Sequence, residues 1–389
     1  MGFEHSNVNA ALIATFGYAF PSEKVVFFAE KDHIAFVSQS LSDFSIEIEY
    51  HEIDIPIRRS NFFAMIPAFI TCTRLFRLAV ACDARMIVFS SITSPCLISI
   101  KLLTKAFGSV KCVVVPHSIL EDVLKRRPSL SRRNLKEWLD ELLFGFRRWL
   151  AVGNSSRIRY VILGESIRQE LARELPRLRK YLFSIDLPYL FQPATDLKPL
   201  SRRVIRFGFF GVASVRKGVD TFFRVAEAVK DKKTRYKSEF ILIGHFTDEK
   251  AKKFTNDAVR VPSPDQPLDS QSYDLYARSI DYAIFLHKST SYNLVASAAL
   301  FDSFSYVKPV IALKSSFFEH YFSRMGDIGY LCASYNELEK VILDILEGKT
   351  AARYPIQQKN ILIHRGQLTP IAQSRKLARL WENTNEGSD

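Results

Sequence analysis

The stretch from Phe207 to Gly218, FGFFGVASVRKG, combines an apolar run with a loop bounded by glycines. The loop ends in Arg216, Lys217 and Gly218, directly before a segment at 219–229 with a helical pattern of apolar residues. Glycines let a backbone approach a ligand closely, and a helix N-terminus presents unpaired N–H groups to an anion. The stretch therefore predicts a strand, a loop and a helix of an α/β domain, and the loop is either a phosphate site or a tight turn. It contains neither the GxxxxGK[ST] nor the GxGxxG spacing.

A second segment, about 80 residues further on, repeats this arrangement. An apolar strand predicted at 281–287 leads through a polar loop to a helix predicted at 294–305, and a strand predicted at 307–313 follows. The helix begins with small residues, among them Ser297 and Ala298, which allow a ligand to come close. Asp302 follows on the same helix, where a carboxylate could accept hydrogen bonds from ribose hydroxyls.

Together the two segments resemble the C-terminal domain of GT-B glycosyltransferases. The similarity is greatest to the large group of retaining, family 4-like (group 1) enzymes that use GDP- or UDP-sugars. Lys217 and Gly218 match the Lys-Gly pair that grips the donor diphosphate in that group, and the sequence KPVI at 308–311 matches its strand. Asp302 falls where the ribose-binding carboxylate stands. The resemblance implies an α/β fold with two Rossmann-like domains facing across a cleft.

The resemblance also implies site residues. Arg216 and Lys217 would neutralise the leaving diphosphate, and His117, after the apolar run at 113–116, would contact the transferring sugar. The alternative for His117 is a histidine that caps the next helix or bonds to a loop carbonyl. The remaining implied residues are Gly211, Gly218, Ser297, Ala298, Asp302 and Glu319 on the donor side, and His5, Asn7 and Glu165 on the acceptor side. A solvated residue at a helix start is the alternative for Glu165.

Two positions depart from the pattern of these enzymes. Val212 stands where the group has its diphosphate-binding arginine, and Leu294 stands where it has its first carboxylate. Arg216 is the candidate to replace the missing arginine. The absent carboxylate leaves open whether transfer retains or inverts the configuration of the sugar.

The length of 389 residues accommodates two domains. Strand-like and helix-like segments alternate in the first half, which predicts a parallel sheet covered on both faces. A segment with prolines at 188–203 suits a linker. We therefore expect an acceptor-binding domain at 1–195 and a nucleotide-sugar-binding domain at 196–365. The helix within 366–389 is expected to cross back to the first domain.

Charge and composition narrow the possible partners. The chain carries 54 Lys and Arg against 41 Asp and Glu, and residues 125–180 alone carry 15 against 6. Within that region an apolar stripe at helical spacing, inside 132–150, either docks on its own domain or contacts an anionic membrane surface. No nucleic-acid reader motif is present. The five cysteines are scattered without CxxC, and neither HExxH nor a DxD-type site occurs, so no metal site and no cofactor is expected.

The N-terminus lacks the pattern of a signal peptide, and the longest uncharged apolar run, Ser60–Thr73, is shorter than the roughly 20 residues that span a bilayer. We expect a cytoplasmic protein, with the cytoplasmic membrane face as a peripheral location. The predicted function is transfer of a sugar from a nucleotide-diphosphate sugar to a glycan or lipid-linked acceptor, in surface polysaccharide synthesis. The alternatives are a nucleotide-sugar epimerase on the same scaffold and a non-catalytic GT-B-like binding subunit.

Overall fold

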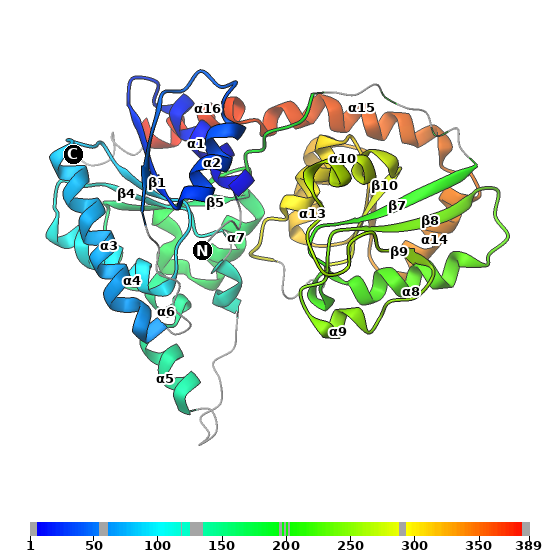
Figure 1. The fold of residues 1–389 in the computed structure, drawn as a ribbon, viewed down its shortest axis with the longest axis horizontal. Helices are drawn as coiled ribbons and strands as arrows, with labels where there is room; N and C mark the ends of the chain where they lie inside the picture. The colour runs from blue at the N-terminus through cyan, green and yellow to red at the C-terminus, as the bar shows by residue number, and fades with distance from the viewer. Residues whose placement is uncertain are drawn as a thin grey trace. The chain divides into compact units, whose positions relative to one another are not determined.

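The computed structural model describes residues 6–53, 61–117, 119–124, 135–193, 197, 200, 203–287 and 293–382. The chain divides into two compact units (Figure 1). Unit 1 comprises Met1–Leu190, Leu294–Ala296 and Leu368–Asp389, and unit 2 comprises Phe191–Asn293 and Ser297–Gln367. The first change of unit falls about five residues before the boundary expected at 195. The segment Leu294–Ala296 returns to unit 1, which no sequence pattern indicated.

Unit 1 contains two parallel sheets. One has the strand order β3-β4-β5-β6, formed by Ile87–Phe89, Cys112–Val114, Ile158–Leu163 and Leu182–Ile185. The other pairs β1 (Val25–Ala29) with β2 (Ile48–Glu52). These strands confirm the parallel α/β pattern that the alternating segments predicted. Because the strands are parallel, their carboxyl ends lie at one edge of each sheet.

Helices surround these sheets. They are α1 (Ser6–Ala19), α2 (Lys31–Ser40), α3 (Asn61–Ala81), α4 (Ser94–Ala106), α5 (Leu135–Phe144), α6 (Phe146–Ala151), α7 (Glu165–Glu174) and α16 (Pro370–Glu382), with the 3-10 helices η1 (Ile119–Leu124) and η3 (Pro176–Tyr181). The last helix, α16, packs against α1. The ring of Trp381 lies edge-on to Phe20 at 5.9 Å, and Gln373 accepts a 2.8 Å hydrogen bond from the backbone of Asp186. The C-terminal helix is thus part of unit 1.

Unit 2 is built on one six-stranded parallel sheet with the order β12-β11-β10-β7-β8-β9. Its strands are β7 (Val204–Phe210), β8 (Lys237–Ile243), β9 (Val259–Arg260), β10 (Tyr282–Phe285), β11 (Val310–Leu313) and β12 (Gly329–Cys332). The stacked rings of Phe207, Phe240 and Tyr282, with centroids 5.0 and 5.9 Å apart, run across three neighbouring strands and hold the middle of the core.

The helices of unit 2 are α8 (Val219–Lys230), α9 (Glu249–Lys252), α10 (Ser270–Ser279), α12 (Ala298–Ser305), α13 (Ser316–Met325), α14 (Tyr335–Leu346) and α15 (Tyr354–Arg365). In Figure 1, α8 and α14 lie on one side of the sheet, and α10 and α13 on the other. Apolar residues of α8 and α14, such as Phe222 and Ile342, share one buried cluster with the strands.

The strand order of unit 2 identifies where a ligand should bind. The chain proceeds from β7 outward through β8 and β9, then returns to β10 on the other side of β7 and continues outward through β11 and β12. The order therefore reverses between β7 and β10. In open parallel sheets, ligands bind at the carboxyl ends of the strands beside such a reversal. The loops that follow β7 and β10 carry the two segments singled out in the sequence.

One predicted helix boundary is wrong. The helix expected at 294–305 begins at Ala298, after Ser297 as its N-cap. Leu294–Ala296 precede the helix and belong to unit 1, so these three residues are not part of the helix repeat. The start of α12 is consequently set at the small residues Ser297 and Ala298, four positions later than the sequence suggested.

Candidate functional site

The loop after β7 is pinned to the end of the neighbouring strand. Gly211, at φ 83°, donates a backbone hydrogen bond of 2.9 Å to Ile243, and Ala213 donates one of 2.8 Å to His245. A Cβ on Gly244 would lie 1.9 Å from the carbonyl oxygen of Gly211. Only glycine fits at 244, and a positive φ favours glycine at 211. The backbone of the loop is therefore closely fixed.

The loop then forms one turn of 3-10 helix, Val215–Lys217, before α8. The hydroxyl of Ser214 accepts a hydrogen bond of 3.3 Å from the backbone N–H of Lys217. Gly218 follows at φ 81° as the N-cap of α8, and a Cβ there would lie 2.2 Å from the carbonyl oxygen of Leu286. The Lys-Gly pair thus passes directly over the end of β10. This packing holds the Lys217 backbone at the reversal of the strand order.

Three elements meet beside Gly211. A Cβ built on Gly211 would lie 3.6 Å from Nζ of Lys217 and 4.0 Å from Cβ of Ala299. The ammonium group, the glycine backbone and the first turn of α12 therefore face one point. An ammonium group attracts an anion, and the unpaired N–H groups at a helix N-terminus do the same. This point in unit 2 is suited to a phosphate or diphosphate.

Burial dominates the electrostatics of Lys217. Burial, and to a smaller extent the nearby Arg216, lower the pKa of Lys217 to about 8, while Asp302 opposes the shift. Arg216 itself is exposed. A bound anion would reverse the shift, because it favours the charged form of the lysine. Lys217 and Asp302 thus lie within electrostatic range of each other.

His287 also lies beside Lys217 and Arg216, although no motif in the sequence marks it. It follows β10, it is buried, and its ring stacks on Phe318 of α13 with centroids 5.7 Å apart and planes at 17°. Burial lowers the pKa of His287 to about 3, and Lys217 and Arg216 contribute to the shift. The imidazole is therefore neutral at pH 7 and lies within the field of both cations. The available signal was a polar residue at the carboxyl end of a buried parallel strand.

The remaining donor-side candidates also lie in unit 2. Ser297 is buried and caps α12 without a side-chain hydrogen bond to the helix, Ala298 is the first helical residue, and Asp302 lies about one turn further on. Glu319 lies in the first turn of α13, where its carboxylate pairs with Lys314 at 3.0 Å. Leu294, at the position of the missing carboxylate, is fully buried. It offers no polar group to a sugar.

The acceptor-side candidates lie in unit 1, apart from His5, which falls outside the described residues. Asn7 is exposed in the first turn of α1. His117 follows β4, and Glu165 follows β5 as the first residue of α7. Because β4 and β5 are parallel neighbours, His117 and Glu165 lie at the same edge of the unit 1 sheet. This is the edge at which such sheets bind ligands.

Glu165 already has protein partners. Its carboxylate accepts hydrogen bonds from Arg168 at 2.5 and 2.8 Å, from Gln169 at 2.9 Å and from Ser184 at 2.5 Å. These contacts, above all the one with Arg168, lower the pKa of Glu165 to about 2. The carboxylate ties the start of α7 to β6. Its role toward an acceptor stays a prediction.

The apolar stripe predicted within 132–150 divides at Gly145. Residues 132–134 lie outside the described part of the chain. Phe146 and Leu150 of α6 are buried, whereas the leucines of α5, at 135, 139, 142 and 143, are exposed. Docking on the domain therefore holds for α6, whereas α5 contacts α3 but leaves its leucines exposed. The segment offered for membrane contact shrinks to α5.

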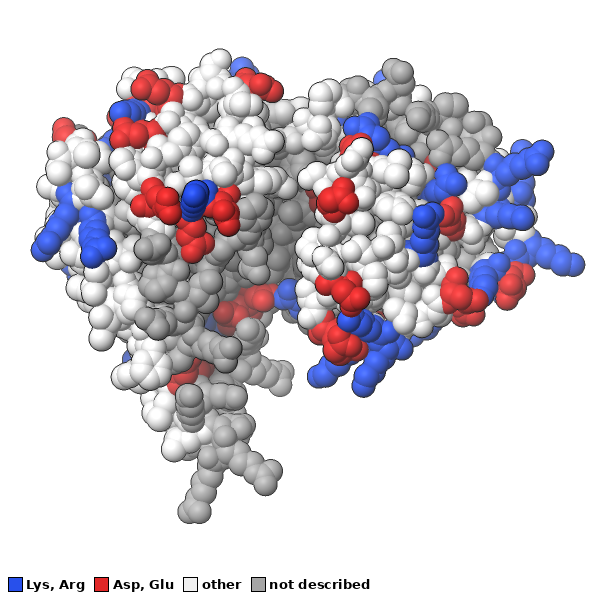
Figure 2. All heavy atoms as spheres, in the orientation of Figure 1, with Lys and Arg blue, Asp and Glu red and all other residues white. Residues whose placement is uncertain are grey.

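Charge on the visible face is mixed. Figure 2 shows Lys and Arg side chains beside Asp and Glu over unit 2, and ion pairs such as Lys230–Asp257 and Lys252–Asp265, both at 2.6 Å, account for part of this pattern. Among the described residues no group of three or more His, Cys, Asp or Glu could hold a metal ion.

Comparison with known proteins identifies the fold. No protein-family model matches the chain, and no curated protein matches it. Among solved structures it is similar to HepE of Anabaena in complex with UDP and glucose, with a TM-score of 0.60 and 13% identity over 98% of this chain and 97% of that one. A glycosyltransferase of Rickettsia africae gives a TM-score of 0.60 and 11% identity, covering 99% and 96%. WaaG, a glycosyltransferase involved in lipopolysaccharide biosynthesis, gives a TM-score of 0.56 and 12% identity over 92% of this chain and 98% of that one.

These likenesses run over nearly the whole length of each chain, at identities that establish the fold and not the activity. The chain has the GT-B fold with two Rossmann-like domains. Both the α/β class and the resemblance expected from the sequence are confirmed.

Proposed function

We propose that this protein is a glycosyltransferase that moves a sugar from a nucleotide-diphosphate sugar to a glycan or lipid-linked acceptor, in the synthesis of a surface polysaccharide. The observation that carries the proposal is the meeting of Lys217, Gly211 and the first turn of α12 at one point. The structural neighbours support it, since HepE is described in complex with UDP and glucose and WaaG as a glycosyltransferase of lipopolysaccharide biosynthesis.

In the proposed reaction an acceptor hydroxyl oxygen forms a bond to the anomeric carbon of the donor sugar. The bond from that carbon to the diphosphate oxygen breaks, and its electron pair leaves with the nucleotide diphosphate. The proton of the acceptor hydroxyl passes to the released diphosphate or to water. Lys217, Arg216 and the N–H groups at the start of α12 stabilise the charge that develops on the leaving group. Because these groups are fixed before the donor arrives, little reorganisation is needed during the reaction.

Other residues would hold the rest of the donor. Asp302, one turn into α12, would accept hydrogen bonds from the ribose hydroxyls, and Ser297 with Ala298 would present backbone N–H groups to the phosphates. His287 is neutral, so it can donate a hydrogen bond to a phosphate oxygen without adding charge. Gly211 and Gly218 keep the approach free of side chains, and Glu319 stands beside this region on α13.

We also propose that the transfer requires no divalent metal and that the transferred group is a hexose. Two cationic side chains and a helix N-terminus supply the neutralisation that a metal ion supplies elsewhere. Turnover should therefore persist in EDTA. A requirement for added Mg²⁺ or Mn²⁺ would contradict this part of the proposal.

The test is a thermal-shift and calorimetry screen of the full-length protein against UDP, GDP, CDP, dTDP and ADP and their sugars. A ligand at 100 times its Kd adds about 2.7 kcal/mol to the stability of the folded protein. We expect one nucleotide to respond strongly and Lys217→Ala to abolish the response while the fold is kept. The matched control is Lys237→Ala, because Lys237 is exposed at the opposite, amino end of β8.

Turnover separates the alternatives. A transferase releases the nucleotide diphosphate only when an acceptor is present, whereas an epimerase converts the donor without one. A third possibility is a non-catalytic binding subunit. The buried Leu294, which stands in place of a carboxylate, is the reason to test it. That alternative predicts nucleotide binding without turnover of any donor. If no nucleotide responds, and Lys217→Ala behaves as the wild type, the transferase proposal fails.

A further inference from the structure

Two helices of unit 1 expose an extended apolar surface. The first ten residues of α3 and the whole of α5 contribute it, and we call it the α3–α5 surface. Phe63 is 70% exposed and Ile66 is 71% exposed. The large apolar side chains that form this surface are Phe62, Phe63, Ile66, Phe69 and Ile70 of α3 with Leu135, Leu139, Leu142 and Leu143 of α5. Exposed apolar groups of this number are rare on a soluble monomer and mark an interaction site.

The two helices form one surface because they touch. The amide of Asn61 donates a hydrogen bond of 2.8 Å to the carboxylate of Asp140, and the ring of Phe62 lies 6.4 Å from that of Phe144, edge to face. Figure 1 shows α5 beside the first turns of α3 in unit 1. The exposed leucines of α5 recur at intervals of four, three and one, which places them on one side of the helix.

The rest of α3 is anchored in unit 1. Cys72, Phe76 and Ala79 are buried, and this half of the helix packs against α4. By length and composition alone α3, with 21 residues, could cross a membrane. Its exposed part, 61–70, would extend only about 15 Å, which is half of the roughly 30 Å of a bilayer core. The surface can therefore lie in a membrane interface but cannot cross it.

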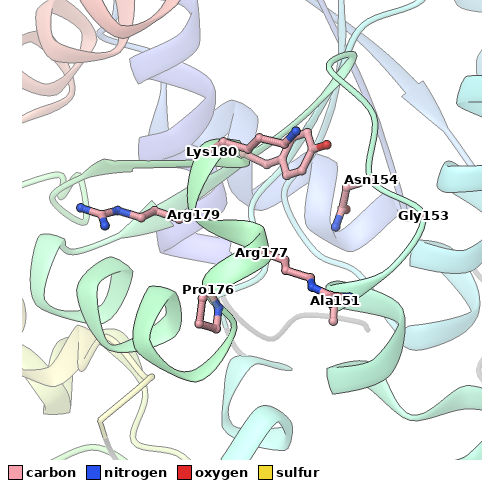
Figure 3. A pocket seen from close by; sticks show the side chains of 8 residues that line it. Ala151, Gly153, Asn154, Pro176, Arg177, Arg179 and Lys180 are labelled. Carbon is pink, nitrogen blue, oxygen red and sulfur yellow. The ribbon is translucent and has the colours of Figure 1, made fainter.

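Basic residues lie on α6, which contacts α5, and on η3, which contacts α6. Arg148 of α6, three residues past the junction with α5 at Gly145, is exposed and donates a hydrogen bond of 2.6 Å to the carbonyl of Leu142. At the other end of α6 lies a hollow of about 820 Å³, which contains no acidic residue in its lining (Figure 3). Its lining includes Arg177, Arg179 and Lys180 of η3, all of them exposed. Cations beside an apolar surface complement the anionic headgroups of a bilayer.

We propose that the α3–α5 surface docks on an anionic lipid bilayer. The phenylalanines and isoleucines of α3 and the leucines of α5 enter the boundary between headgroups and acyl chains, while Arg148 and the cations of η3 contact lipid phosphates. The inference is drawn from the surface of unit 1 and goes beyond sugar transfer. It holds whatever nucleotide unit 2 binds. It would place unit 1 where a lipid-linked acceptor is found.

The test is co-sedimentation of the full-length protein with vesicles of phosphatidylcholine and phosphatidylglycerol at 3:1, and with vesicles of phosphatidylcholine alone. The wild type should bind the anionic vesicles, and Phe62→Ser/Phe63→Ser/Ile66→Ser should lower the partition coefficient more than about tenfold. The matched control replaces three exposed apolar side chains of unit 2, Leu275→Ser/Ile356→Ser/Ile363→Ser, and should bind as the wild type does. Circular dichroism and thermal unfolding verify that each variant is folded.

A second variant isolates the charge. Arg177→Gln/Arg179→Gln/Lys180→Gln should weaken binding to anionic vesicles and flatten its dependence on salt, without changing binding to neutral vesicles. The proposal is overturned if the wild type stays in the supernatant with both vesicle types, or if the triple serine variant of α3 binds normally. A wild-type dimer that becomes monomeric in that serine variant, with no vesicle binding, would assign the surface to a second copy of the chain. Each of these results is independent of nucleotide binding in unit 2.

Discussion

Nζ of Lys217 lies 3.6 Å from the point that a Cβ on Gly211 would occupy. A methyl group there would sit between the ammonium and the first turn of α12, because Cβ of Ala299 is 4.0 Å from the same point. Both distances are ordinary van der Waals contacts. The fold can therefore accommodate this methyl group, but the methyl group would occupy the space that a bound anion needs.

This relationship predicts that Gly211→Ala weakens nucleotide binding more than it weakens the fold. The positive φ of Gly211 costs an alanine about 1–2 kcal/mol of stability, whereas the methyl group occupies the anion position and should cost at least about tenfold in affinity. Calorimetric titration with the responding nucleotide measures this. Gly326→Ala is the control, because Gly326 also has a positive φ, of 74°, and a Cβ there would meet only Asn360, at 3.5 Å. Equal affinity losses in both variants would contradict the assignment.

The lowered pKa of Lys217 predicts a pH dependence of binding. In the free protein Lys217 loses its proton near pH 8, and a bound diphosphate favours the charged form. Binding above pH 8 must therefore take up a proton, and the affinity should fall by up to about tenfold per pH unit as the pH rises. Titrations at pH 7, 8 and 9 measure the slope. Lys217→Arg stays charged over this range, so its affinity should be nearly constant; a parallel decline in that variant would assign the dependence to another group.

His287 should not titrate near neutrality. Its pKa of about 3 means that the unfolded chain takes up a proton below pH 6.5 while the folded chain does not. Stability should therefore fall as the pH drops from about 6.5 toward 3, by up to about 1.4 kcal/mol per pH unit. His287→Phe, which preserves a ring stacked on Phe318, should reduce this acid sensitivity. Imidazole shifts followed by NMR give a direct check, and a titration midpoint near 6 for His287 would refute the prediction.

The lowered pKa of Glu165 predicts a second dependence of the stability of the fold on pH. Its pKa is lowered to about 2, so the stabilisation it provides is complete above the ordinary value near 4.5 and disappears as the pH falls through 2. Glu165→Gln should cost about 1 kcal/mol at pH 7, because the carboxylate is partly exposed and solvent weakens its contacts. The difference from the wild type should vanish toward pH 2 in denaturation curves. Glu170→Gln, on the same helix and paired with Arg173, should change stability less.

Lys101 of α4 stabilises the C-terminal end of α6. This buried lysine donates hydrogen bonds to the carbonyls of Trp149, Leu150 and Val152 and to the side chain of Asn154. Lys101→Met would leave the last carbonyls of α6 without this donor, at a cost of about 3 kcal/mol in the free energy of unfolding. Lys105→Met, one turn further along α4 and exposed, should be nearly neutral. Urea denaturation of the two variants distinguishes them, and equal midpoints would show that Lys101 does not support α6.

The sequence predicted local elements well where the pattern was strong. The helical segment at 219–229 and the strand expected at 281–287 agree with α8 and β10 to within two residues at each end. Periodicity failed for the helix expected at 294–305, since the small apolar residues at its start fit a helix but belong to a segment that packs with unit 1. The apolar spacing also ran through α5 and α6 as one stripe. Spacing alone does not show which apolar side chains become buried against another element.

By itself, the sequence determined the parallel α/β class, the GT-B resemblance and the Lys-Gly loop. Glycine, lysine and the period of the apolar residues act over a few positions along the chain, so a local pattern records them. The tertiary structure decided that Lys217, Gly211 and Ala299 converge, that His287 is neutral beside two cations, and that the leucines of α5 remain exposed. Each of these depends on what packs against a residue from far along the chain, and burial and electrostatic field arise only when those partners are in place.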